Sequence, residues 1–270
     1  MKLKKVYENL ISEGRTKKLS KKKLIDLYNE KVGIGPHKLP SVYRGKKSKT
    51  KYGFVKPAEF ERSSAYTLNY YTLIIDNSKH WRNYPDRSKS LVCTTSKTKS
   101  SDYGSVYRVV PFPGAEVGVT PEGDIWDSFS HLENKVDIDD LQHLNHSLRK
   151  LGEACIGREV SDESWSEFKK DLSRIAKCDS FNQLYQTGEY PPKIDQFITP
   201  FKLNIKRLAE YFFPNYISLV EMFEDLLHPD KNNFEKKKFD PNVTFSKGVE
   251  VWTDSPALLI RDGHFPEELA

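Results

Sequence analysis

The chain has 270 residues, of which 37% are hydrophobic and 12% aromatic, so it is long enough to bury a core and is not a disordered chain. Its charge is uneven. Residues 1–60 carry 17 Lys and Arg against 5 Asp and Glu, a net charge of +12, whereas residues 61–270 carry 26 against 33, a net charge of −7. This asymmetry indicates an anionic partner, or polyanion, for residues 1–60.

No apolar run reaches the length of a signal-peptide core or a membrane span, so no membrane partner is expected. The three cysteines, Cys93, Cys155 and Cys178, form no close pair in the sequence. This pattern fits a reducing compartment better than a disulfide framework. We expect a cytoplasmic protein, and a protein packaged in a virus particle and delivered to a host cytoplasm has the same composition.

Two short helices are predicted first, over residues 3–13 and 20–32, with Ser20 as the N-cap and Gly33 as the stop of the second. Together they make residues 1–35 a basic helical N-terminal segment. A short strand follows and ends in Tyr43-Arg44-Gly45. A fixed guanidinium before a residue without a side chain suits a bound phosphate or diphosphate.

A helix over residues 63–78 precedes an apolar strand at 91–93, which ends in the hydroxyl cluster Thr94-Thr95-Ser96. The β-branched run 106–110 and the segment 116–120 are predicted as further strands.

Residues 131–242 change character, because leucines and aromatic residues recur there at helical spacing. We interpret this region as a helical insertion. It contains His143 and His146 beside Asp139 and Asp140, but no third ligand motif, and no metal site is predicted. Two more strands follow, 248–252 and 257–260, and the first carries Glu250 among strand-forming residues.

Taken in chain order, Arg44, a Ser/Thr triplet that closes a strand, and the late strand-borne Glu250 resemble the ADP-ribosyltransferase superfamily in its Arg-Ser-Glu form. The resemblance is to scattered motifs. The triplet is either Cys93-Thr94-Thr95 or Thr94-Thr95-Ser96. If Glu250 corresponds to the family's earlier acid, Trp252 stands at the catalytic place.

The resemblance implies NAD as the co-substrate and a divergent, toxin-like or phage-encoded transferase. It implies that Glu250 stabilises the positive charge that develops on ribose when nicotinamide leaves, and we expect Glu250 to be an exposed cleft carboxylate. Thr95 and Ser96 orient this acid and the ribose. The NAD-binding residues implied are Tyr43, Arg44, Gly45, Thr94 and Tyr103, of which Arg44 holds the diphosphate and Tyr103 borders the nicotinamide.

The fold class expected is α+β, with two small antiparallel sheets forming an NAD cleft, N-terminal helices and a large, mostly helical insertion. The transferase-like core then comprises residues 36–130 and 243–262, and the insertion comprises 131–242. The acceptor of ADP-ribose is a protein or a nucleic acid. Two alternatives stay open: a non-enzymatic basic nucleic-acid-binding or virion-associated protein, and a catalytically dead transferase fold that binds the nucleotide without turnover.

Overall fold

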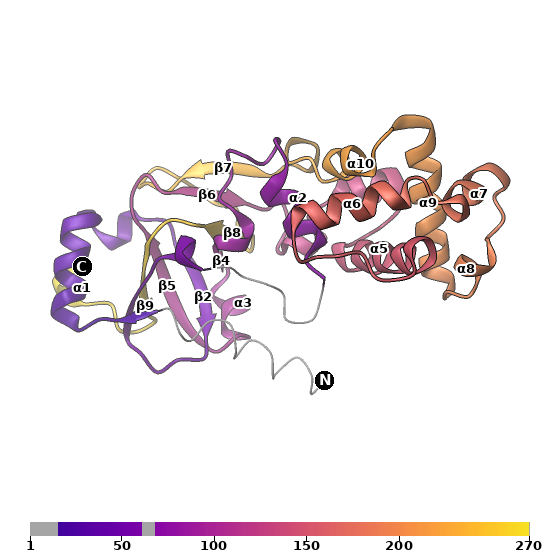
Figure 1. Cartoon of the computed structure of the whole chain (residues 1–270). Helices are drawn as coiled ribbons and strands as arrows, with labels where there is room; N and C mark the ends of the chain where they lie inside the picture. Colours follow the sequence, from indigo (N-terminus) through magenta and orange to yellow (C-terminus); the bar gives the residue numbers. More distant parts are fainter. Residues whose placement is uncertain (1–15, 61–67, 270) are drawn as a thin grey trace. The chain divides into compact units, whose positions relative to one another are not determined.

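The computed structural model describes residues 16–60 and 68–269 (Figure 1). The chain forms two compact units. Among the described residues, the first combines 16–60, 83–124 and 234–269, and the second combines 68–82 and 125–233. The first unit holds the strands and the second holds most of the helices, so the predicted α+β class is confirmed.

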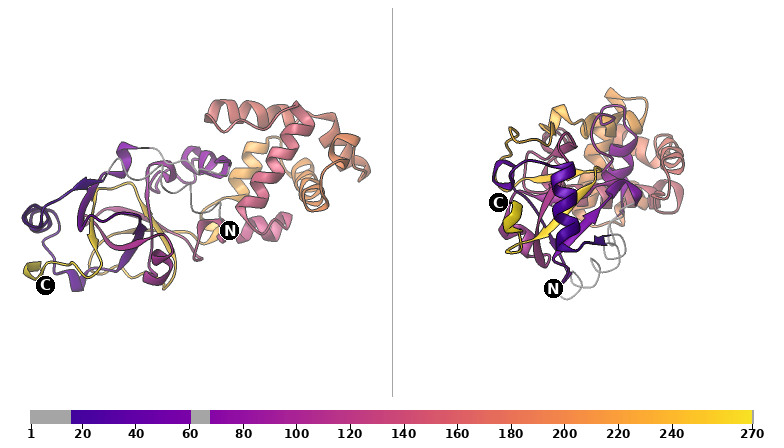
Figure 2. Two further views of the ribbon diagram at one scale, coloured as in Figure 1. Left: turned by 90° about the horizontal axis from the view of Figure 1, so that it is seen from below. Right: turned by 90° about the vertical axis from the view of Figure 1, so that its left-hand side faces the viewer.

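Within the described residues, the strands form one antiparallel sheet of nine, in the order β1-β3-β9-β5-β2-β4-β8-β6-β7. Figure 2 shows these strands curving around a common centre. Their bounds are β1 (Lys17–Lys18), β2 (Val42–Lys46), β3 (Tyr52–Val55), β4 (Leu91–Thr94), β5 (Ser105–Pro111), β6 (Glu116–Val119), β7 (Glu235–Lys238), β8 (Glu250–Thr253) and β9 (Ala257–Arg261).

The prediction of two small sheets is wrong. Strand β2 pairs with β5 along its whole length and also with β4, through Tyr43 and Thr94. This single bridge joins the group β1-β3-β9-β5-β2 to the group β4-β8-β6-β7, and so makes one continuous sheet. The strands predicted at 91–93, 106–110, 116–120, 248–252 and 257–260 are present with small shifts at their ends.

Three strands were not predicted from the sequence: β1, β3 and β7. Of these, β1 and β7 lie at the two edges of the sheet. Both consist mainly of lysine: β1 is Lys17–Lys18, and β7 has the sequence Glu-Lys-Lys-Lys. Lysine is depleted in strands generally but is common on edge strands, where its charge opposes pairing with another chain.

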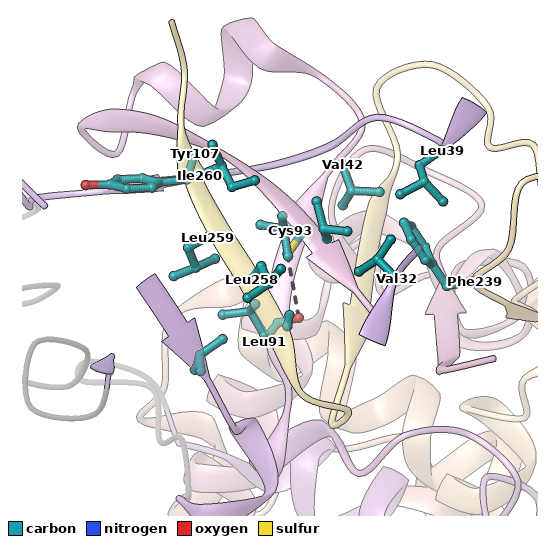
Figure 3. Close-up of a cluster of buried hydrophobic side chains, with 14 of the residues drawn as sticks. Val32, Leu39, Val42, Leu91, Cys93, Tyr107, Phe239, Leu258, Leu259 and Ile260 are labelled. Carbon is teal, nitrogen blue, oxygen red and sulfur yellow. Dashed lines mark hydrogen bonds between the residues drawn. The ribbon is translucent and has the colours of Figure 1, made fainter. Parts of the chain in front are cut away.

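The core of the first unit lies against the sheet, and α1 (Lys21–Lys31) packs on it through Leu24 and Tyr28. Helix α1 confirms the helix predicted over 20–32, with Ser20 as its N-cap and Gly33 at a left-handed φ of 62° after its end. Figure 3 shows Val42, Cys93 and the β9 residues Leu258 to Ile260 in this core. A second helix of this unit, α3 (Lys97–Ser101), follows β4.

The second unit is helical. Its helices are α2 (Tyr70–Asn77), α4 (Ser130–Val136), α5 (Leu141–Ile156), α6 (Trp165–Ile175), α7 (Asp179–Thr187), α8 (Pro192–Asp195), α9 (Thr199–Asn215) and α10 (Leu219–Leu226). The helix predicted over 63–78 corresponds to α2 in its second half, while residues 61–67 and the helix predicted over 3–13 lie outside the described residues. None of the helices in the described part of the chain is both long and apolar enough to cross a bilayer.

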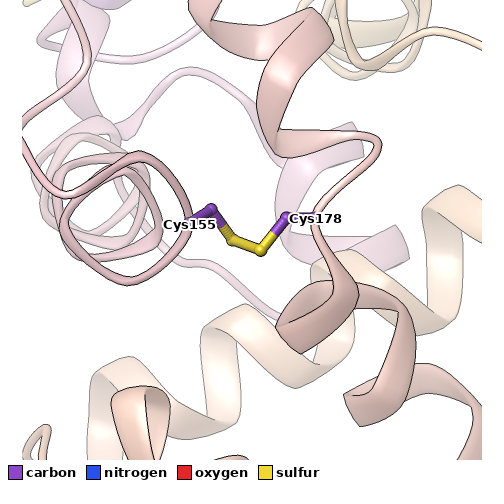
Figure 4. The surroundings of a disulfide bond; sticks show 2 residues. All are labelled: Cys155 and Cys178. Carbon is purple, nitrogen blue, oxygen red and sulfur yellow. A yellow bond between two sulfur atoms is a disulfide. The ribbon is translucent and has the colours of Figure 1, made fainter.

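A disulfide joins Cys155, near the end of α5, to Cys178, just before α7, with 5.5 Å between the Cα atoms (Figure 4). The expectation that the cysteines do not pair is wrong for these two. They are 23 residues apart in the sequence, and α6 lies between them, so the packing of α5 and α7 brings them together rather than any local motif.

Candidate functional site

Five residues on five neighbouring strands form one row across the sheet of the first unit. Ile260 on β9 is opposite Arg108 on β5, Arg108 is opposite Tyr43 on β2, Tyr43 is opposite Thr94 on β4, and Thr94 is opposite Glu250 on β8. Directly opposed residues point to the same face of a sheet. This cross-strand row therefore brings two predicted residue pairs, Tyr43 with Thr94 and Thr94 with Glu250, onto one face.

A pocket of about 370 Å³ lies at one end of the row, and Ile260, Arg108 and Tyr43 all line it. Its other walls include Phe265 and His37. Neighbouring strands are about 4.8 Å apart, so the Cα atoms of Tyr43 and Glu250 are separated by about 10 Å across β4. A ligand of dinucleotide length spans that distance.

The pocket is cationic and partly aromatic. Arg108 and Arg261 contribute guanidinium groups, and the guanidinium carbon of Arg108 lies 5.6 Å from the centre of the Phe265 ring. One acid, Asp262, also lines the pocket, but it forms an ion pair with Lys97 of α3 at 2.7 Å. The charge left over is positive, which suits a ligand with phosphate groups and an aromatic base.

Only part of the Arg108 guanidinium forms hydrogen bonds with the protein. Its Nη2 donates to the carbonyl oxygens of Pro36, at 2.6 Å, and Leu39, at 3.0 Å. Its Nε is buried and makes no hydrogen bond within the described residues. A buried donor of this kind costs free energy unless a ligand or water accepts from it, so Arg108 fits a bound diphosphate. The sequence analysis did not predict Arg108, and the one local signal for it is its place as a lone arginine in the β-branched run 106–110.

Glu250 is not the exposed cleft carboxylate that the sequence analysis expected. It is 8% exposed, and its Oε1 lies 2.7 Å from Nη2 of Arg87, which is 5% exposed. Arg87 belongs to the short 3-10 turn Arg87–Lys89, and its guanidinium lies over the ring of Trp252 at 5.4 Å. Arg87 neutralises the charge of the acid. Removal of either partner alone would leave the other charge buried without its counter-charge.

The hydroxyl cluster after β4 fixes the segment that leads into β8. The Thr95 hydroxyl donates to the Ser246 carbonyl and accepts from the backbone N–H groups of Gly248 and Val249. The Ser96 side chain caps α3 by accepting from the N–H of Lys99. Thr94, which belongs to both possible triplets, is the member of the cluster that lies opposite Glu250.

Arg44 lies one residue after Tyr43 on β2, and alternate residues of a strand point to opposite faces. Its guanidinium donates to the carbonyl oxygen of Val92. The structure therefore does not bring Arg44 together with Tyr43, Thr94 and Glu250. Tyr103 is 46% exposed, in the turn between α3 and β5.

Gly45 packs against protein rather than lying open to a ligand. A Cβ atom added there would lie 1.9 Å from the Ser100 carbonyl oxygen of α3 and 2.7 Å from the Tyr103 Cβ. The absence of a side chain at Gly45 allows α3 to pack against β2.

Gly45→Ala is expected to lower the free energy of unfolding by about 1–3 kcal/mol or more, because the added methyl group meets a backbone atom that cannot rotate away. Urea unfolding measures this. Ser41→Ala, at an exposed position before the same strand, is the control and should leave the midpoint unchanged. A Gly45→Ala protein as stable as the control would show that α3 does not pack on β2 in this way.

In the second unit, a small polar group lies at the N-terminus of α5. It consists of Asp139, Asp140 and His143, whose possible metal-ligand atoms lie within 4.8 Å of one another. Asp140 accepts from the His143 N–H as the N-cap of α5, and the hydrogen bond that the His143 ring donates to the Asp139 carboxylate raises the pKa of His143. Helix capping and this histidine–carboxylate pair account for the geometry.

The chain matches no protein-family model, no curated protein and no solved structure.

Proposed function

We propose that the protein is an NAD-dependent ADP-ribosyltransferase that cleaves the bond between nicotinamide and ribose and transfers ADP-ribose to an acceptor. The observation that carries the proposal is the cross-strand row. It joins a cationic pocket, through Tyr43 and Arg108, to a hydroxyl residue and an acid, Thr94 and Glu250, on adjacent strands.

In this proposal, Arg108 and Arg261 hold the diphosphate of NAD in the pocket, and Tyr43 and Phe265 contact its aromatic or ribose groups. The leaving of nicotinamide develops positive charge on the ribose. A preorganised carboxylate lowers the free energy of that transition state more than that of bound NAD. Glu250 is this carboxylate, and Arg87 fixes its position.

The buried ion pair between Glu250 and Arg87 favours one alternative, a transferase-like fold that binds the nucleotide without turnover. One experiment distinguishes the active transferase from the fold that only binds the nucleotide. The purified protein is incubated with NAD, released nicotinamide is measured by chromatography, and NAD binding is measured by titration calorimetry. Binding with release supports the transferase, binding without release supports the alternative, and the absence of binding contradicts both.

Arg108→Lys is expected to weaken NAD binding about tenfold or more, because an ammonium cannot reproduce charged hydrogen bonds from a planar guanidinium. Arg44→Lys is a matched comparison. Both arginines are partly buried on adjacent strands and donate to backbone carbonyls, but of the two only Arg108 lines the pocket. Calorimetry on both variants, with thermal unfolding as a check on folding, decides between them. If only Arg44→Lys loses affinity for NAD, then Arg44 and not Arg108 binds the diphosphate.

A further inference from the structure

The lysines of the first unit gather along one edge of its sheet. Lys17 and Lys18 form the edge strand β1, where they lie opposite Phe54 and Gly53 of β3. Lys49 and Lys51 lie in the loop between β2 and β3, immediately before β3 begins. All four side chains are exposed, and we call them the lysine edge.

Two contacts hold the parts of the lysine edge together. The Lys46 ammonium, at the end of β2, donates to the Thr16 hydroxyl at 2.7 Å, just before β1. The Leu19 N–H, just after β1, donates to the Tyr52 carbonyl at 3.0 Å. The loop and the edge strand therefore form one surface rather than two separate groups of lysines.

Most of the charge of this surface is not neutralised by the residues that the structure describes. Residues 16–60 carry 13 Lys and Arg against 3 Asp and Glu. Within the described part of the chain, Lys21, Lys31 and Lys56 form ion pairs, and the four lysines of the lysine edge do not. The lysine edge thus faces solvent with a charge of about four units, which attracts the condensed counterions or phosphates of a polyanion.

An exposed aromatic side chain lies beside the same loop. Gly104 packs so closely on it that an added Cβ would lie 2.9 Å from the carbonyl carbon of Lys46 and 3.1 Å from the backbone nitrogen of Lys47. Tyr103, the residue before it, is 46% exposed. The ring thus lies at the start of the loop that carries Lys49 and Lys51. Exposed rings and ammonium groups on one surface are the combination on which unpaired bases stack while their phosphates are neutralised.

We propose that the lysine edge and Tyr103 bind single-stranded nucleic acid. The lysines contact successive phosphates, and Tyr103 stacks on an unpaired base. In a duplex the bases stack on one another and are not available to Tyr103. This inference goes beyond the proposed function and does not depend on it, because binding needs neither NAD nor turnover.

The test is fluorescence anisotropy with labelled single-stranded and duplex oligonucleotides of the same length, at a series of salt concentrations and without NAD. Replacing Lys17, Lys18, Lys49 and Lys51 together by glutamine is expected to weaken single-strand binding about tenfold or more at low salt, and to reduce the slope of log affinity against log salt by up to about 2.8. The matched control replaces four exposed lysines of the second unit, Lys79, Lys170, Lys177 and Lys193, and should change neither quantity.

Tyr103 is tested separately. Tyr103→Ala should weaken single-strand binding about fivefold or more, and Tyr103→Phe, which keeps the ring, should restore it. Equal losses in the two lysine sets, affinity that is indifferent to salt, or equal affinity for a heparin fragment of the same charge would overturn the proposal. The proposal would also be overturned if the protein bound the duplex more tightly than the single strand and Tyr103→Ala left that binding unchanged.

Discussion

Glu250→Gln is expected to lower the free energy of unfolding by about 3–5 kcal/mol, because it leaves the guanidinium of Arg87 buried without its counter-charge. It is also expected to reduce nicotinamide release from NAD at least about a hundredfold, the scale of one preorganised electrostatic contact. Denaturant unfolding and chromatographic detection of nicotinamide measure the two effects.

Because the single variant changes stability and chemistry together, a second variant separates them. Arg87→Met combined with Glu250→Gln removes both charges, and we expect it to recover most of the lost stability, since no buried charge is then left without its counter-charge. Release of nicotinamide should stay low. If the double variant releases nicotinamide at the wild-type rate, Glu250 acts only in folding.

Loss of the disulfide between Cys155 and Cys178 is expected to destabilise the protein by about 2–4 kcal/mol, because the bond closes a loop and so restricts the unfolded chain. The measurement is the urea midpoint of the protein with Cys155→Ser and Cys178→Ser.

Wild-type protein with and without a reducing agent provides the control. The reducing agent should lower the midpoint of the wild type and leave the double variant unchanged. The denatured, unreduced wild type should show one free thiol, that of Cys93. Three free thiols would contradict the pairing.

The strands were predictable where their signal is local. The apolar runs at 91–93, 106–110 and 257–260 each form a strand, because short runs rich in β-branched and apolar residues favour a buried strand. The edge strands β1 and β7 were not predictable in this way. Their lysines follow from a position at the edge, which depends on the rest of the sheet.

The candidate site depends on information that the sequence does not carry locally. A shift of one residue along β2 exchanges Tyr43, which lines the pocket, for Arg44, which contacts Val92. The phase of a strand is set by its pairing, so the arginine with the clearer local motif is not the one in the pocket. Arg87 and Glu250 likewise meet only because β4 and β8 pair.

The order in which the first unit is assembled has a consequence for synthesis. Its strands β1 to β6 come before the helical unit, but β7, β8 and β9 follow it, so residues 234–269 complete a sheet begun more than a hundred residues earlier. Until β8 and β9 arrive, β4, β5 and β3 lack a neighbour, and Thr94 has no Glu250 beside it. Until residues 250–261 have left the ribosome, the nascent protein therefore lacks the acid of its own candidate site.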